Sequence, residues 1–165
     1  HLYKVKHLIL CHGDHNTGTF ADATWPAILS ELSTNTLASI QIIYSVYSTM
    51  REQRRGTIIH MNSVAGKRYA PGEAVYSASK HAMAGFLQTL RPEAKQYKIR
   101  IMDVFIGAVQ TGMTNSRNDS NSLIRPVDVA KLVFRLATDE YASLQVDEIT
   151  LSRWLDLPPA IPRHV

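Results

Sequence analysis

The sequence has little of what marks an exported or membrane-embedded protein. Its only cysteine is Cys11, so no disulfide can form within the chain, which fits a reducing compartment. No apolar run approaches the roughly 20 residues that a membrane-spanning helix needs. The first residues lack the long apolar region of a signal peptide. We therefore expect a cytoplasmic protein that does not insert into a membrane.

Repeats, low-complexity tracts and blocks of like charge are also missing, so no linker divides the chain. The 165 residues, 45% of them hydrophobic, suffice for one core that buries about 70% of the unfolded surface. The net charge of +4 is dispersed, too little for a nucleic-acid surface. A solvated helix end, with Gly56 as its expected cap, explains the cluster at Arg51, Arg54 and Arg55. We expect one domain over residues 1–165 that binds no nucleic acid.

Apolar patterning predicts an alternation of strands and helices. Short apolar or β-branched runs predict strands over residues 5–11, 57–61, 99–105 and 148–151. Apolar residues three or four apart predict helices over residues 26–55, 74–96 and 126–138. Parallel strands need crossover connections, which these helices can supply. The predicted fold class is α/β, a doubly wound parallel sheet of about four strands with flanking helices.

In such sheets, ligands bind beyond the carboxyl ends of the strands, where Gly13, Ser63 and Gly107 fall. Tyr76 and Lys80 are four residues apart on a predicted helix, and therefore lie on one face about one turn apart. An ammonium within about 4 to 6 Å favours the phenolate form of a tyrosine, whose ordinary pKa is about 10. We predict that Lys80 lowers the pKa of Tyr76, and that the Ser63 hydroxyl bonds a substrate oxygen.

Two other kinds of site fit the sequence less well. The run C-H-G-D-H contains metal-ligand residue types, but it lies in one loop without a second ligand cluster at a recognised spacing. Ser63 with His60 or His81 could suggest a hydrolase, but M-N-S-V-A lacks the G-x-S-x-G turn that exposes a nucleophile. We expect neither a metal site nor a nucleophilic serine.

The segment from Ser63 to Lys80, S-V-A-G-K-R-Y-A-P-G-E-A-V-Y-S-A-S-K, resembles the Ser/Tyr/Lys active-site segment of short-chain dehydrogenases/reductases. Other landmarks of that family follow in order. Asn35 in T-N-T-L-A-S-I resembles the family's helix asparagine, and I-G-A-V-Q-T resembles its P-G-x-V-x-T segment. The turn L-C-H-G keeps only Gly13 of the family's N-N-A-G, and Ile106 replaces a proline. The resemblance covers nearly the whole chain.

The resemblance implies hydride transfer between NAD or NADP and a small-molecule carbonyl or alcohol substrate. Tyr76 is then the acid/base, Ser63 stabilises the substrate oxygen, Lys80 holds the cofactor ribose, and the Asn35 backbone holds a water of the proton relay. The implied cofactor-binding residues are Gly13, Tyr76, Lys80, Gly107, Val109 and Thr111. Residues 113–125 correspond to the family's substrate loop, which we expect to be a mobile lid. A homodimer or homotetramer is also implied.

The family's T-G-x-x-x-G-x-G turn, which binds the pyrophosphate at a helix N-terminus, is missing from the sequence. Residues 5–11 already correspond to the family's fourth strand, so the chain resembles the catalytic half alone, and the resemblance implies a partial Rossmann-like fold. The sequence is then part of a longer protein, the product of a degenerate gene, or one half of a site completed by another chain. We favour the first and expect weak or no activity from these 165 residues by themselves. The alternative is a non-catalytic binding or dimerisation module.

Overall fold

The computed structural model describes residues 4–69, 71–114, 123–138 and 143–153. Four parallel strands form one sheet in the order β1-β2-β3-β4. They span β1 (His7–Leu10), β2 (Gly56–Ser63), β3 (Ile99–Ile106) and β4 (Glu148–Leu151). The main helices are α1 (Trp25–Leu32), α2 (Ala38–Gln53), α3 (Ala74–Gln96) and α4 (Pro126–Ala137). The prediction of a four-stranded parallel α/β sheet with flanking helices is confirmed.

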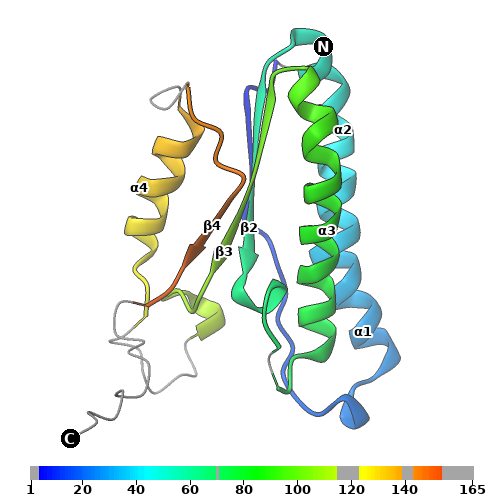
Figure 1. The fold of residues 1–165 in the computed structure, drawn as a ribbon. Helices are drawn as coiled ribbons and strands as arrows, with labels where there is room; N and C mark the ends of the chain where they lie inside the picture. Colours follow the sequence, from blue (N-terminus) through cyan, green and yellow to red (C-terminus); the bar gives the residue numbers. More distant parts are fainter. Residues whose placement is uncertain (1–3, 70, 115–122, 139–142, 154–165) are drawn as a thin grey trace, which may run out of the picture.

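The sheet lies between two layers of helices, with α2 and α3 on one side and α4 on the other (Figure 1), and an apolar core fills each interface. Because side chains alternate along a strand, Ile58 and Ile101 face α2 and α3, whereas Ile59 and Met102 face α4. In the first core, Ile58 and Ile101 pack with Ile43, Met50, Met83 and Leu87. In the second core, Ile59 and Met102 pack with Val133 and Leu136. Strands β2 and β3 are therefore covered on both sides, as is typical of central strands in a parallel sheet.

The predicted helix over residues 26–55 is continuous but not uniform. The Thr24 side chain caps its start by accepting a hydrogen bond from Ala27 N at 3.4 Å. A π-helical segment, Ser33–Leu37, then joins α1 to α2 and contains Asn35. Such wider turns often occur at functional sites. The local widening thus coincides with one of the predicted site residues.

The end of α2 differs from the sequence expectation. The left-handed residue that ends the helix is Arg54, with φ of 49°, and Gly56 is already the first residue of β2. Gly56 is required for packing instead, because a Cβ there would lie 2.5 Å from Met50 Sδ and 2.8 Å from Met50 Cγ. Met50 is fully buried in the core under the sheet, so it has little room to move.

We expect Gly56→Ala to lower the free energy of unfolding by about 1–3 kcal/mol, because the added methyl overpacks the core against Met50. Urea unfolding measures the loss. Gly85→Ala is the matched control, since a Cβ at Gly85 meets nothing within 4 Å and Ala favours the helical backbone by about 0.5–1 kcal/mol. Equal stability of the two variants would contradict the packing role of Gly56.

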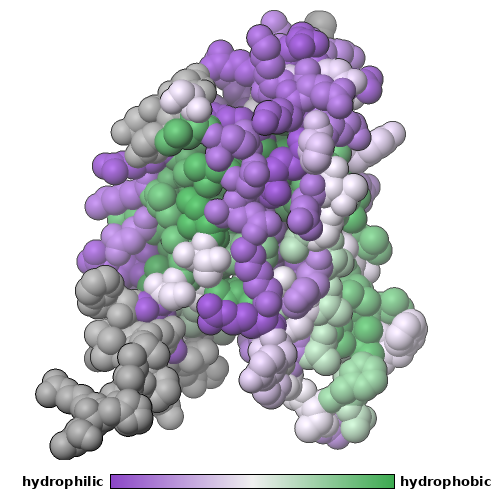
Figure 2. All heavy atoms as spheres, in the orientation of Figure 1, coloured by the Kyte–Doolittle hydropathy of each residue, from purple (hydrophilic) through white to green (hydrophobic). Residues whose placement is uncertain are grey.

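The surface carries an apolar area at the lower right of Figure 2, where α1 lies in Figure 1. In α1 and the turn before it, Phe20, Trp25 and Leu29 are exposed.

None of the helices in the described ranges is long and apolar enough to cross a membrane. Most of the predicted substrate loop, residues 115–122, lies outside the described residues.

Candidate active site

A cavity of about 710 Å³ opens at the carboxyl ends of β1, β2 and β3. Its volume is within the range of small-molecule sites, about 300–1,000 Å³. Its walls bring together seven of the eight predicted site residues: Gly13, Ser63, Tyr76, Lys80, Gly107, Val109 and Thr111. Asn35, the eighth, does not line the cavity, because it is fully buried. Its hydrogen bonds to neighbouring residues are given below.

Tyr76 lies in the first turn of α3 and faces the end of β2. Burial raises the pKa of its phenol, the Ser63 side chain lowers it through a hydrogen bond, and the carboxylates of Glu73 and Glu31 raise it. The net direction is upward and thus opposite to the sequence prediction, in which Lys80 lowered it. Tyr76 is therefore held as a neutral phenol, the form that can donate a proton.

The Ser63 hydroxyl is positioned by the turn that follows β2. Its Oγ accepts a hydrogen bond from Ala65 N at 3.1 Å, and Ser63 N donates to Asn62 Oδ1 at 2.8 Å. The hydroxyl hydrogen of Ser63 can therefore donate to the Tyr76 oxygen, or to a substrate oxygen that enters the cavity beside it.

His15 and Glu73 form a pair beside Tyr76 that the sequence interpretation missed. The rings of His15 and Tyr76 meet edge-on, with centroids 4.5 Å apart. His15 Nε2 lies 3.1 Å from Glu73 Oε1, and both residues line the cavity. This pair limits the positions open to the Tyr76 ring. No spacing rule could find it, because His15 is in an irregular loop 58 residues before Glu73.

Lys80 lies one turn after Tyr76 and is only 4% exposed. Its Nζ is 5.5 Å from the centroid of the Tyr76 ring. Burial lowers the pKa of this ammonium, whereas the charges of Asp103 and Glu31 raise it. A Cβ at Gly13 would lie 3.5 Å from Lys80 Nζ and 3.4 Å from Asn35 Oδ1. Because glycine has no side chain, the space at Gly13 beside the Lys80 ammonium stays open for a ligand.

Asn35 fixes the loop that follows β1. Its Oδ1 accepts a hydrogen bond from Asp14 N at 2.7 Å, and its Nδ2 donates to Asp14 O at 2.9 Å and to Ser79 Oγ at 3.0 Å. The backbone oxygen of Asn35 accepts from Ser39 Oγ at 2.9 Å. The side chain is therefore structural, and the water expected at the Asn35 backbone stays a prediction.

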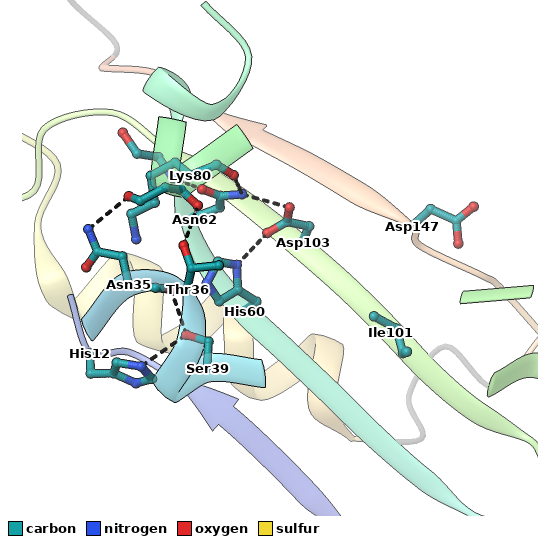
Figure 3. A network of polar contacts seen from close by, with 12 residues as sticks. His12, Asn35, Thr36, Ser39, His60, Asn62, Lys80, Ile101, Asp103 and Asp147 are labelled. Atoms are coloured by element: carbon teal, nitrogen blue, oxygen red, sulfur yellow. Dashed lines mark hydrogen bonds and ion pairs between the residues drawn. The ribbon is translucent and has the colours of Figure 1, made fainter. Parts of the chain in front are cut away.

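The two histidines of C-H-G-D-H have separate partners. His12 Nε2 lies 3.0 Å from Ser39 Oγ, as Figure 3 shows, while His15 pairs with Glu73. Burial lowers the pKa of His12, and the charges of His60 and Lys80 act in the same direction. Within the described ranges, no three His, Cys, Asp or Glu side chains are grouped to hold a metal ion.

Gly107, Val109 and Thr111 form the wall that follows β3. Gly107 N donates to Leu151 O at 2.8 Å, and a Cβ at Gly107 would lie 3.4 Å from the same oxygen. Thr114 Oγ1 donates to Val109 O at 2.7 Å. These bonds fix the backbone of the wall, while the side chain of Thr111 stays exposed at the cavity.

The fold and this site define a Rossmann-like α/β protein whose polar side chains gather at the carboxyl ends of parallel strands. A family model described as short chain dehydrogenase matches residues 1–122. The chain therefore belongs to the short-chain dehydrogenase/reductase family of oxidoreductases.

Its curated relatives include reductases. The chain is 34% identical over 118 residues to a 3-oxoacyl-[acyl-carrier-protein] reductase of Bos taurus, covering 72% of this chain and 50% of the relative. It is 32% identical over 122 residues to carbonyl reductase family member 4 of Xenopus laevis, covering 69% and 52%. The chain spans about half the length of these curated relatives.

Solved structures share the fold. A short chain dehydrogenase/reductase family protein has a TM-score of 0.84 at 18% identity, covering 91% of this chain and 66% of that one. An actinorhodin polyketide ketoreductase structure with NADPH has a TM-score of 0.80 at 23% identity, covering 88% and 65%. The architecture of this chain is therefore that of the family's Rossmann structures.

Proposed function

We propose that the chain is the catalytic half of an NAD(P)-dependent oxidoreductase that interconverts a small-molecule carbonyl and its alcohol. The observation that carries the proposal is the meeting of Ser63, Tyr76 and Lys80 at one cavity, from β2 and from two turns of α3. Several relatives are reductases by name, which supports the same chemistry.

Tyr76 is the proton donor of this proposal. Its raised pKa keeps the phenol protonated near neutral pH, so that it can protonate an alkoxide as that group forms. Ser63 can donate a hydrogen bond to the same oxygen and stabilise its developing charge. In alcohol oxidation the step runs in reverse: the phenolate form of Tyr76 accepts the alcohol proton and becomes the neutral phenol. The protein thus supplies proton transfer and charge stabilisation at one oxygen.

The residues around Lys80 fit the nicotinamide ribose. The space beside Gly13 lies against the Lys80 ammonium, which can donate hydrogen bonds to ribose hydroxyls. Gly107, Val109 and Thr111 line the wall where the nicotinamide would lie. When bound, the nucleotide supplies or accepts the hydride.

Exposed large side chains on and just before α2 support the proposal that copies of the chain associate as a homodimer or homotetramer. Leu37 is 62% exposed and Tyr44 is 82% exposed, and both precede or lie within α2. Large apolar side chains on one helix surface are suited to contacts between subunits.

Nucleotide binding tests the proposal. In the complete protein, we expect Lys80→Met to weaken NADPH or NADH binding, followed by nicotinamide fluorescence, about ten- to a hundredfold, because charged hydrogen bonds are lost. Lys95→Met is the matched control, because Lys95 is exposed in the last turn of α3. Equal binding by both variants would refute the assigned role of Lys80.

The same titration on the 165-residue chain separates the alternative function. Turnover together with tight binding would eliminate the non-catalytic module, because such a module needs no nucleotide. The absence of binding to the chain and to the complete protein would support that module.

A further inference from the structure

A buried polar network lies beneath the cavity and has no part in the proton transfer proposed above. His60 and Asp103 are directly paired across β2 and β3, and each is 1% exposed. His60 Nδ1 lies 2.9 Å from Asp103 Oδ1, and Asn62 Nδ2 donates to Asp103 Oδ2 at 2.8 Å. Both oxygens of the Asp103 carboxylate thus have a partner inside the protein (Figure 3).

Strand geometry directs this network toward α3. Residues two apart on a strand share a face, so His60 and Asn62 lie on the side of Ile58, which packs in the core under α2 and α3. Asp103 shares that side with Ile101. The network therefore fills the part of the interface that lies closest to the carboxyl ends of the strands.

Asn62 joins Asp103 to the turn of α3 that carries Lys80. Its Nδ2 also donates to the backbone oxygen of Lys80 at 3.3 Å. Gly66 packs closely against both groups, because a Cβ there would lie 3.1 Å from Asn62 Oδ1 and 3.1 Å from Lys80 O. The Lys80 backbone is thus held between β2 and the turn that follows it.

The Lys80 ammonium is buried and therefore needs nearby negative charge. Tyr76 approaches it from the same helix, His12 from the loop after β1, Glu31 from α1 and Asp103 from β3. His60, from β2, bonds to Asp103. The Asp103 and Glu31 carboxylates are the charges that oppose the cost of burial, and Asp103 is the larger of the two influences.

We propose that Asp103 is a positioning residue for Lys80: through Asn62 it fixes the backbone at Lys80, and its carboxylate stabilises the buried ammonium. Its importance for reduction rests on the proposed function. Its effect on Lys80 does not, because the charge of Lys80 can be observed without nucleotide or substrate.

The experiment follows the Lys80 ¹³Cε signal against pH in the full chain labelled at lysine, with Lys80→Arg to assign the signal. In Asp103→Asn we expect the Lys80 pKa to fall by about one pH unit, because a neighbouring negative charge is lost. Asp147→Asn is the matched control, since Asp147 makes its ion pair with Arg91 and lies apart from Lys80 in Figure 3. Its Lys80 titration should equal that of the wild type.

A double variant, His60→Leu with Asp103→Val, serves if Asp103→Asn does not fold, because replacing both buried partners by apolar groups is often tolerated. The same fall in the Lys80 pKa is expected. An unchanged Lys80 titration in whichever variant folds would overturn the proposal. Failure of the complete protein to reduce any carbonyl would count against the proposed function alone, because the titration is read without turnover.

Discussion

Tyr76→Phe is expected to lower nucleotide-dependent carbonyl reduction by the complete protein about 10²–10⁴-fold, the usual contribution of a positioned acid. Phenylalanine keeps the ring that meets His15 edge-on and removes only the hydroxyl. The unfolding midpoint should therefore stay close to that of the wild type. Single-turnover reduction with saturating NADPH or NADH measures the loss directly.

Tyr69→Phe is the matched control for this prediction. Tyr69 also lines the cavity, but its side chain is 91% exposed, so its hydroxyl is free to exchange hydrogen bonds with water. We expect its removal to change the rate less than about twofold, since exposed groups away from special contacts contribute little. Near wild-type reduction by Tyr76→Phe would remove the tyrosine from the proposed mechanism.

Asn35→Ala is expected to have the largest effect on stability, a loss of about 2–4 kcal/mol in the free energy of unfolding. The variant loses three side-chain hydrogen bonds, two to the backbone of Asp14 and one to Ser79. Alanine cannot replace them, so the Asp14 N–H and C=O lose their partners. Because Gly13 precedes Asp14, we also expect weaker nucleotide binding beside Lys80. Urea unfolding and nucleotide titration measure the two effects.

Ser79→Ala provides the comparison. It removes one bond to Asn35 and the 2.7 Å bond from Ser79 Oγ to Tyr76 O, but leaves the Asp14 backbone paired. Its expected cost is about 1 kcal/mol. If Asn35→Ala were no less stable than Ser79→Ala, the loop anchored by Asn35 would have to be stabilised by other contacts.

Local periodicity was sufficient to predict most of the fold. The helix predicted over residues 74–96 matches α3, Ala74–Gln96, and the strand predicted over residues 148–151 matches β4, Glu148–Leu151. The spacing of Tyr76 and Lys80 is equally local, because both lie on one helix and are one turn apart. Such features follow from backbone geometry over a few residues, which a sequence displays directly.

The helix end at Arg54 shows where local signals fail. Glycine is the common left-handed residue after a helix, so Gly56 was the natural expectation. The strand begins earlier than predicted, because Gly56 pairs with Ile99 in the sheet. The contact of Gly56 with Met50 then explains the glycine. Long-range pairing decided the position of this boundary.

The sequence by itself determined the order of strands and helices, the helical spacing of Tyr76 and Lys80, and the resemblance to the family. Only the tertiary structure decided the surroundings of those residues. The register between β2 and β3 pairs His60 with Asp103, and the loop after β1 brings His15 to Tyr76. Burial also reversed the direction predicted for the Tyr76 pKa. The reason is physical: desolvation and charge act through space, between residues whose separation along the chain carries no signal.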